Sequence, residues 1–491
     1  MAARLPTRNA IFRLMNATQH GACPCHGCRA GGAAHSVAQG FRRFATPVDL
    51  PQKEYAFEIA AANLRFGDGV TSEVGMDFKN QKATKIGVFT DRNVAKLLPM
   101  RVAMDSLQQH AGAPFEVFEN VSVEPTEDSF REAMAFARKH NFSHFLAVGG
   151  GSVMDTAKAA NLFTVYPEAD LFDFINAPVG KGLPIAKTLR PLIAIPTTAG
   201  TGSETTGTAI LDIPSQNFKT GIANRALRPI LGVVDTRNTE SCPTAVHISS
   251  GLDVLFHAME SYTAIPYYER TPRPSNPLLR PAYQGSNPIA DIFSLWAVRQ
   301  AVEHLPRIAK SDEYESRHQM LLAATFAGIA FGNAGVHLCH GISYPISGLN
   351  KTGPKWQHPG YKVDKPIIPH GVSVALTGPA VFRFTAPSAP SRHRELASVF
   401  SAYLAPGTSL DRLADADLGP ALFDAVARFL DGLGLPRGLR AIGYKDEDVP
   451  RLVKGAIPQR RVLDLAPGIG DVAGADGEEH LTTIVSSSMA Y

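Results

Sequence analysis

The sequence predicts a two-domain protein, with an N-terminal α/β domain built on a parallel sheet and an all-α C-terminal domain. Three observations predict this fold class. The 491 residues exceed what one ordinary hydrophobic core can serve. Short apolar runs alternate with helical stretches up to about residue 240, as in parallel sheets covered by helices. Long helical stretches then follow, separated by proline-rich loops.

Short apolar runs in the N-terminal half are the predicted strands. They lie at residues 86–90, 115–118, 144–148 and 192–195. The helical stretches between them lie at 94–110, 129–140 and 152–163. This alternation of strand and helix predicts neighbouring parallel strands, because each helix crosses over and returns the chain to the same end of the sheet.

The C-terminal half is dominated by helical stretches at 250–262, 289–305, 314–331 and 421–433. Two proline-rich loops, 265–288 and 350–369, separate them. Loops of this length are uncommon in compact domains and are often functional. We expect the α/β domain at residues 45–240 and the helical domain at 241–491.

The first 44 residues have a composition of their own. They contain six arginines and no Asp, Glu or Lys, and without them Lys+Arg falls from 48 to 42 against 45 acidic residues. An arginine-rich, acid-free start is typical of a mitochondrial transit peptide, with Arg42 and Arg43 near the cleavage site. A basic tail that stays attached is the alternative. Only Cys242 and Cys339 follow, which suits a reducing compartment such as the matrix.

Composition excludes several classes of function. The net charge of +3 is close to neutral and does not indicate a nucleic-acid partner. No apolar run reaches the roughly 18 residues that a membrane-spanning helix needs. The oligomeric state stays open, with a homo-oligomer as one option.

A glycine-rich turn is the first candidate for a cofactor site. Residues 149–151 are three glycines that follow a predicted strand, and Ser152 and Asp155 begin the next helix. Glycine lets the backbone approach a ligand closely, and the N–H groups of a helix start attract a pyrophosphate. The segment is not the dinucleotide fingerprint G-x-G-x-x-G. A tight strand–helix turn with an ordinary cap is the alternative.

A second loop, residues 196–204, also follows a predicted strand and contains Thr197, Thr198 and Thr201. The carboxyl ends of parallel strands are where α/β sheets bind nucleotides. Asp91 follows another strand and could accept ribose hydroxyls. Lys219 could meet a phosphate, or it could be a solvated hairpin lysine.

Four residues in the helical half are candidate metal ligands. Asp253 and His257 are four residues apart on a helix and therefore share a face. His340 and His370 each precede a glycine beside a loop. One carboxylate and three imidazoles suit Fe²⁺ or Zn²⁺. A hydrogen-bonded core histidine is the alternative for each one alone.

Together these motifs resemble the iron-containing alcohol dehydrogenases. The motifs are GGGSVMDTAK at 149–158, PTTAGTGSE at 196–204 and GLDVLFHAME at 251–260, with the two His-Gly pairs after them. The resemblance extends from about Tyr55 to the C-terminus. It implies a dehydroquinate synthase-like fold, in which a Rossmann-like dinucleotide-binding domain and a helical metal-binding domain enclose the site.

The resemblance also implies a set of site residues. A divalent metal, Fe²⁺ or Zn²⁺, would be held by Asp253, His257, His340 and His370. Dinucleotide contacts would come from Asp91, Gly150, Gly151, Ser152, Asp155, Thr197, Thr198, Thr201 and Lys219. We expect NAD rather than NADP, because the Asp91 carboxylate would repel a 2′-phosphate.

Three further stretches, 274–277, 280–288 and 332–349, resemble a mitochondrial branch of this family that moves hydride between a hydroxy acid and an oxo acid. The resemblance implies oxidation of 4-hydroxybutyrate to succinate semialdehyde and reduction of 2-oxoglutarate to 2-hydroxyglutarate, with tightly bound NAD. The first alternative is an iron or zinc alcohol dehydrogenase that releases NADH. A lyase or synthase, a metal-dependent hydrolase and a non-catalytic binding protein are the others.

The sequence departs from the family pattern at two positions. Many members carry a second histidine four residues after the metal histidine that corresponds to His340, and here that residue is Tyr344. Tyr344 and His337, one turn before His340, are therefore the candidate catalytic residues for proton transfer. Glu124 stands where many relatives carry asparagine near the cofactor.

Both implied substrates carry carboxylates, which arginine binds well through two parallel hydrogen bonds. The loop at 265–288 holds Arg270, Arg273 and Arg280. We expect Arg270 and Arg280 to contact the substrate. Solvated loop arginines are the alternative.

Overall fold

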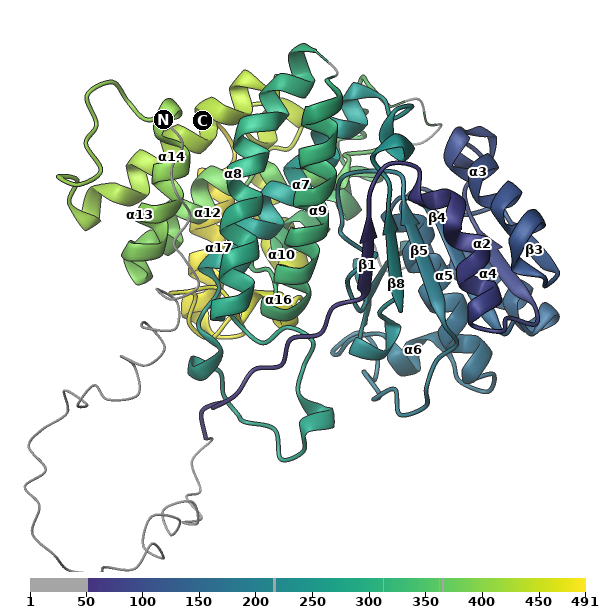
Figure 1. Cartoon of the computed structure of the whole chain (residues 1–491). Coiled ribbons are helices and arrows are strands. Elements are labelled where there is room, and N and C mark those ends of the chain that lie inside the picture. The colour runs from purple at the N-terminus through teal and green to yellow at the C-terminus, as the bar shows by residue number, and fades with distance from the viewer. Residues whose placement is uncertain (1–51, 215–217, 312, 362, 364–365) are drawn as a thin grey trace, which may run out of the picture. The chain divides into compact units, whose positions relative to one another are not determined.

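The computed structural model describes residues 52–214, 218–311, 313–361, 363 and 366–491. They belong to one compact unit, which runs from Pro51 to Tyr491 (Figure 1). The predicted transit peptide at residues 1–44 lies outside the described residues. Both the α/β part and the helical part lie within the unit.

The N-terminal part is built on a sheet that has six strands within the described residues. The strand order is β1-β8-β5-β4-β2-β3, and each neighbouring pair is parallel. The strands are β1 (Asn63–Phe66), β2 (Ile86–Phe89), β3 (Phe115–Phe118), β4 (His144–Gly149), β5 (Leu192–Pro196) and β8 (Leu231–Val234). The prediction of a parallel α/β sheet is confirmed.

Helices cover both faces of this sheet. They are α2 (Val74–Asn80), α3 (Leu98–Ser106), α4 (Glu127–His140), α5 (Gly151–Val165) and the short α6 (Leu171–Phe174). Val88 and Leu146 pack with α2 and α3 on one face. Phe89 and Ala147 pack with α4 and α5 on the other, because side chains alternate along a strand. Burial on both faces explains why β2 is apolar along its whole length and β4 is apolar after His144.

Two details of the sheet differ from the sequence prediction. The expected helix at 94–110 is three pieces: η3 (Val94–Lys96), α3 and a wider π-type turn at Leu107–Ala111. Leu97 is extended between the first two, and Pro99 lies in the first turn of α3, where its missing N–H costs little. The prediction also misses β1, which is half polar, and β8.

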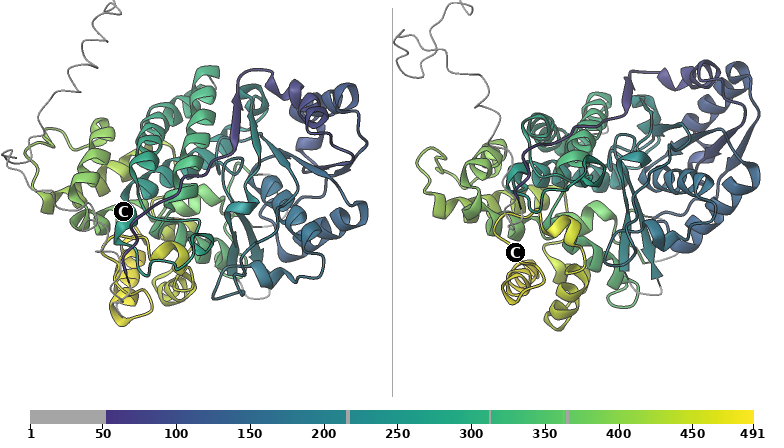
Figure 2. Two further views of the ribbon diagram at one scale, coloured as in Figure 1. Left: turned by 60° about the horizontal axis from the view of Figure 1, so that its bottom comes forward. Right: turned by 90° about the horizontal axis from the view of Figure 1, so that it is seen from below.

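The C-terminal part is helical. Its main helices are α7 (Thr244–Thr263), α8 (Pro288–Lys310), α9 (Tyr314–Ala334), α10 (Leu338–Asn350), α11 (His370–Ala375), α12 (Gly378–Thr385), α13 (Pro390–Val399), α14 (Asp415–Gly432), α15 (Val449–Ala456), α16 (Arg460–Leu463) and α17 (Ala475–Ser487). They lie beside the β1–β8 edge of the sheet (Figures 1 and 2), and Val234 of β8 belongs to their core. The predicted helical half is confirmed.

Helix α7 runs through the middle of this helical core. Every residue from Gly251 to Thr263 is buried. A helix that is buried on all sides carries polar side chains only where they find partners, because an unpaired buried polar group is costly. Asp253, His257 and Glu260 are buried ionisable side chains of this helix, which therefore need partners.

Helices α9 and α10 follow one another with a bend of 102° between them. Within the described residues, no single helix is long and apolar enough to cross a membrane, and this bent pair meets the criterion only by length and composition. Most residues of both helices are buried inside the unit.

Helix α11 packs against α7 so closely at Gly371 that a side chain does not fit. A Cβ atom there would lie 1.8 Å from the carbonyl oxygen of Ser249 and 2.9 Å from the amide nitrogen of Asp253. We expect Gly371→Ala to push α11 away from α7 and to lower the free energy of unfolding by about 1–3 kcal/mol. Thermal unfolding measured by circular dichroism tests this.

Gly432→Ala is the matched control, because a Cβ atom at Gly432 in α14 would meet nothing within 4 Å. Alanine in a helix should leave the stability unchanged or raise it by about 0.5–1 kcal/mol. Equal melting temperatures for the Gly371→Ala and wild-type proteins would contradict the close contact.

Candidate active site

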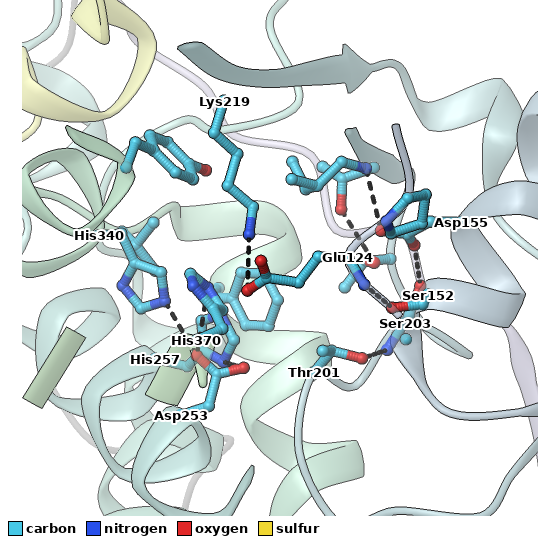
Figure 3. Close-up of a pocket in the computed structure, with 18 of the residues that line it drawn as sticks. Glu124, Ser152, Asp155, Thr201, Ser203, Lys219, Asp253, His257, His340 and His370 are labelled. Carbon is cyan, nitrogen blue, oxygen red and sulfur yellow. Dashed lines mark hydrogen bonds and ion pairs between the residues drawn. The ribbon is translucent and has the colours of Figure 1, made fainter. Parts of the chain in front are cut away.

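One pocket is lined by residues of both the α/β and the helical part (Figure 3). The predicted site residues that line it are Gly151, Ser152, Asp155, Thr201, Lys219, Asp253, His257, His340, Tyr344 and His370. The predicted residues that do not line it are Asp91, Gly150, Thr197, Thr198, Arg270, Arg280 and His337. The fold therefore brings the glycine-rich turn and the metal candidates to one place.

Three of the four candidate metal ligands form a tight buried group. One ligand atom each from Asp253, His257 and His340 lies within 4.8 Å of the others. His370 is outside that group, although its Nε2 is 3.6 Å from Asp253 Oδ1. Asp253 and His257 come from one face of α7, and the other two histidines come from α10 and α11.

The polar atoms of this group fit a bound cation. Asp253 Oδ1, His257 Nδ1, His340 Nε2 and His370 Nδ1 are buried and make no hydrogen bond within the described residues. Buried polar atoms without partners are rare, and a metal would satisfy carboxylate oxygens and imidazole nitrogens together. The chemistry of the donors does not decide between iron and zinc.

Glu260 supports the group from behind. Its carboxylate accepts a hydrogen bond from His340 Nδ1 and another, of 2.5 Å, from the amide of Cys339. A carboxylate bonded to the far nitrogen of a metal-binding histidine fixes the ring and leaves Nε2 facing the metal position. Sequence reasoning missed this role, although Glu260 lies three residues after His257 on the same helix face.

The histidine pKa values follow from burial and from these carboxylates. Burial lowers the pKa of His257 to about 3 and that of His370 to about 4, so both rings are neutral and can donate a lone pair. Burial also acts to lower the pKa of His340, but Glu260 and Asp253 outweigh it and raise the value to about 9. A cation binding at His340 Nε2 therefore competes with a proton.

The two polar loops of the α/β part pack directly on one another. A Cβ atom at Gly151 would lie 2.6 Å from the Thr201 side chain, and one at Gly150 would lie 3.2 Å from Thr198 Oγ1. Gly150 is the N-cap of α5, and no side chain caps the helix there. The first N–H groups of α5 are thus available to an anion such as a pyrophosphate.

Asp155 is engaged within the protein. Its carboxylate accepts hydrogen bonds from Ser203 Oγ at 2.6 Å and from the amide of Ile210 at 3.0 Å. Burial raises the pKa of Asp155, while burial lowers the pKa of neighbouring Lys158 to about 8. Asp155 therefore supports the loop at 196–204 while it lines the pocket, and its contact with the cofactor stays a prediction.

Asp91 ends β2 as expected. Its Oδ1 accepts hydrogen bonds from the amides of Asn93 and Val94 at 2.8 and 3.0 Å, which leaves the second oxygen for a ligand. Thr197 is buried just after β5, and Thr198 packs against Gly150 at the start of α5.

Lys219 lies on the metal side of the pocket. It belongs to the antiparallel hairpin of β6 (Thr208–Ile213) and β7 (Phe218–Ala223), and its Nζ is 3.4 Å from Glu124 Oε1 (Figure 3). Burial acts to lower the pKa of Lys219, but Glu124 and Asp212 outweigh it and hold the pKa above its ordinary value. The pocket therefore contains a permanent ammonium group.

The two candidate catalytic residues lie in different surroundings. Tyr344 lines the pocket, and its ring is nearly parallel to that of His370, with ring centroids 6.4 Å apart. His337 is fully buried behind the pocket, 2.9 Å from Thr263 Oγ1 and 3.1 Å from Glu260 Oε1. His337 does not line the pocket, and its part in proton transfer stays a prediction.

The two candidate substrate arginines do not reach this pocket. Arg280 is buried against Glu54, with Nε 2.9 Å from Oε2, because the extended N-terminal segment crosses the loop at 265–288. Arg270 lines a neighbouring cavity that shares Tyr283 with the pocket. The arginine that sequence reasoning missed is Arg461, whose Nη2 is 2.7 Å from Tyr344 Oη.

Comparison with known proteins agrees with this geometry. The model of the iron-containing alcohol dehydrogenases matches residues 61–236, and that of the C-terminal part of the same family matches 282–353 and 364–467. The chain belongs to the iron-containing alcohol dehydrogenase family. Of the buried group, His340 lies within the matched C-terminal region, whereas Asp253 and His257 lie between the two matched regions.

Curated members of the family are similar over most of the chain. The mitochondrial hydroxyacid-oxoacid transhydrogenase of Rattus norvegicus is 51% identical over 437 residues, which is 89% of this chain and 90% of the rat protein. The Homo sapiens protein of that name is 48% identical over 483 residues, 98% of each chain.

Solved structures of the family share the fold at lower identity. A 1,3-propanediol oxidoreductase is 23% identical, with a TM-score of 0.72, over 88% of this chain and all of the other. An NADH-dependent butanol dehydrogenase A from Thermotoga maritima is 22% identical, with a TM-score of 0.68, over 90% and 99% of the two chains.

We expect His257→Ala to abolish both the bound metal and the activity, because the variant leaves one carboxylate and two imidazoles. Metal content by plasma mass spectrometry measures this after loading with Fe²⁺ or Zn²⁺. His304→Ala is the matched control, since His304 is a buried histidine of α8 that bonds to Ser316 outside the pocket. A fully active, metal-replete His257→Ala protein would rule out the assignment.

Proposed function

We propose that this chain is a mitochondrial hydroxyacid-oxoacid transhydrogenase. It oxidises 4-hydroxybutyrate to succinate semialdehyde and reduces 2-oxoglutarate to 2-hydroxyglutarate. The observation that carries the proposal is the 48% identity to the human protein over 98% of both chains. A pocket that joins the start of α5 to a buried Asp/His/His group supports it.

The two half-reactions balance without a further oxidant. 4-Hydroxybutyrate gives up a hydride from its carbinol carbon and a proton from its hydroxyl oxygen. 2-Oxoglutarate takes up a hydride at its keto carbon and a proton on its oxygen. The net transfer of two electrons and two protons therefore needs only a carrier that stays on the protein between the two steps.

The residues of the pocket would have separate roles in the reaction. Asp253, His257, His340 and His370 would hold a divalent metal, for which we favour Fe²⁺. When bound, the metal would polarise the substrate oxygen and the nicotinamide would carry the hydride. Glu260 keeps the His340 ring oriented, and buried Phe331 and Val336 exclude water from the reacting atoms.

The α/β part of the pocket would hold NAD. We assign the pyrophosphate to the start of α5 at Gly150, Gly151 and Ser152, with Thr201 facing it from the second loop. Asp91 would bind the adenosine ribose. The remaining predicted cofactor residues are Asp155, Thr197, Thr198 and Lys219. Lys219 lies nearest the metal side and would therefore meet the nicotinamide half.

The closest competitor is an alcohol dehydrogenase that releases NADH after each turnover. The solved relatives named as propanediol and butanol enzymes have the same fold, so the fold does not separate the two functions. Retention of the cofactor separates them.

We expect the full chain, loaded with Fe²⁺ and given no NAD, to form 2-hydroxyglutarate from 4-hydroxybutyrate and 2-oxoglutarate over many turnovers. Mass spectrometry of the products measures this. The His257→Ala protein serves as the control and should form none. If product formed only when NAD was supplied and NADH accumulated, the chain would be a conventional dehydrogenase.

Mitochondrial import is a second part of the proposal. The curated relatives carry "mitochondrial" in their names, and residues 1–44 have the composition of a transit peptide. We expect residues 1–44 to direct a fluorescent protein to mitochondria, with cleavage near Ala45. The same segment with Arg8→Glu and Arg13→Glu should leave the reporter in the cytosol. A reporter that stays in the cytosol with the native segment would contradict import.

A further inference from the structure

The hydroxyl of Tyr344 is a donor without an acceptor in the pocket. Its oxygen accepts a hydrogen bond from Arg461 Nη2 at 2.7 Å, which occupies lone-pair density on the oxygen. No hydrogen bond from the Tyr344 hydroxyl to an acceptor occurs within the described residues. Since a phenol has one proton to donate, that proton is available to a molecule in the pocket.

Arg461 is a cation that lies beside Tyr344 and packs on aromatic rings. Its guanidinium carbon lies over two tyrosine rings, 5.6 Å from the centroid of Tyr283 and 5.9 Å from that of Tyr344. Its Nε is buried without a hydrogen bond, and no carboxylate of the described chain lies within 4.0 Å of it. A sheltered guanidinium without a counter-anion favours an anion brought in by a ligand.

The surroundings fix Arg461 relative to the metal candidates. Helix α16, which begins at Arg460, packs on α10, because a Cβ atom at Gly341 would lie 2.4 Å from Leu463. Gln459, the residue before α16, donates a hydrogen bond of 2.9 Å to the carbonyl of Lys219. One short segment therefore positions the hydroxyl of Tyr344 and the strand that carries Lys219.

His340 and Tyr344 are four residues apart on α10 and share a helix face. Their Cβ atoms are therefore separated by about one helical turn, roughly 5–6 Å. Both residues also line the same pocket, so a molecule whose oxygen lies against the metal group can direct a second polar group toward the Tyr344 hydroxyl.

The two proposed substrates have the same spacing of groups. In 4-hydroxybutyrate two methylenes separate the carbinol carbon from the carboxylate. In 2-oxoglutarate two methylenes also separate the keto carbon from the distal carboxylate. A single anion receptor at a fixed distance from the metal would therefore serve both half-reactions.

We propose that the Tyr344 hydroxyl, held and polarised by Arg461, binds the distal carboxylate of both substrates, an inference that rests on the proposed function. Tyr344 donates its proton to a carboxylate oxygen, and Arg461 is a positioning residue that supplies the positive charge behind it. This pair selects substrates that carry a carboxylate two methylenes from the reacting carbon.

The test compares substrates that differ only in the distal carboxylate. The pairs are 4-hydroxybutyrate with 1-butanol, and 2-oxoglutarate with 2-oxopentanoate. For Tyr344→Phe and Arg461→Met we expect KM for the two acids with a distal carboxylate to rise by about 10- to 100-fold, since each variant weakens a hydrogen bond to a charged group. We expect kcat/KM for the two analogues to stay within about threefold of wild type.

Arg460→Met is the matched control, because Arg460 belongs to the same helix and pairs with Asp464 at 2.7 Å outside the pocket. It should leave all four substrates unchanged. Arg461→Lys keeps the charge and should restore part of the affinity lost in Arg461→Met. Tyr344→Phe removes a single oxygen, so the test survives if Arg461→Met does not fold.

Two outcomes would overturn the inference. Equal losses on 2-oxoglutarate and 2-oxopentanoate would mean that Tyr344 serves the reacting atoms, and unchanged KM values would mean that it contacts neither carboxylate. Failure of the proposed function is separate, because it appears in the wild type. A wild type that never reduced 2-oxoglutarate would still allow the comparison of 4-hydroxybutyrate with 1-butanol.

Discussion

The metal side of the pocket depends on the hydrogen bonds that the buried carboxylate of Glu260 accepts. It is fully buried, it accepts hydrogen bonds from the His340 ring and the Cys339 amide, and it lies 3.1 Å from His337 Nδ1. Those contacts join α7 to the start of α10. A buried carboxylate with three partners of this kind is stabilised as the anion, and the histidines hold the pKa of Glu260 well below its ordinary value although burial raises it.

Much of the fold and of the metal group is visible in the sequence, because both rest on local patterns. The apolar runs of β2, β4 and β5 are continuous since helices cover both faces of the sheet. Asp253 and His257 are neighbours by helix geometry alone. The prediction that His340 joins them required the resemblance to a family, because no local sequence pattern relates residues of α7 to residues of α10.

The sequence could not distinguish the charged residues that line the pocket from those that do not. The local sequence does not separate Arg270, Arg280 and Arg461. In the structure, only Arg461 of these three donates a hydrogen bond to a residue that lines the pocket, which is Tyr344. Arg280 forms a salt bridge with Glu54, which is more than 200 residues away in the chain. Asp155 lines the pocket as its motif suggests, and its oxygens also accept hydrogen bonds from Ser203 and Ile210. Contacts between residues that are far apart in the chain decide these roles.

The candidate ligands are spread over α7, α10 and α11, with the proline-rich loop at 350–369 between the last two. No short segment of the chain contains the whole site, so a cation cannot be bound in its final geometry until these three helices have packed. A polypeptide that crosses a membrane in an unfolded state would therefore arrive without its metal. The identity of that metal would then be set by the ions available where the chain folds, and not where it is synthesised.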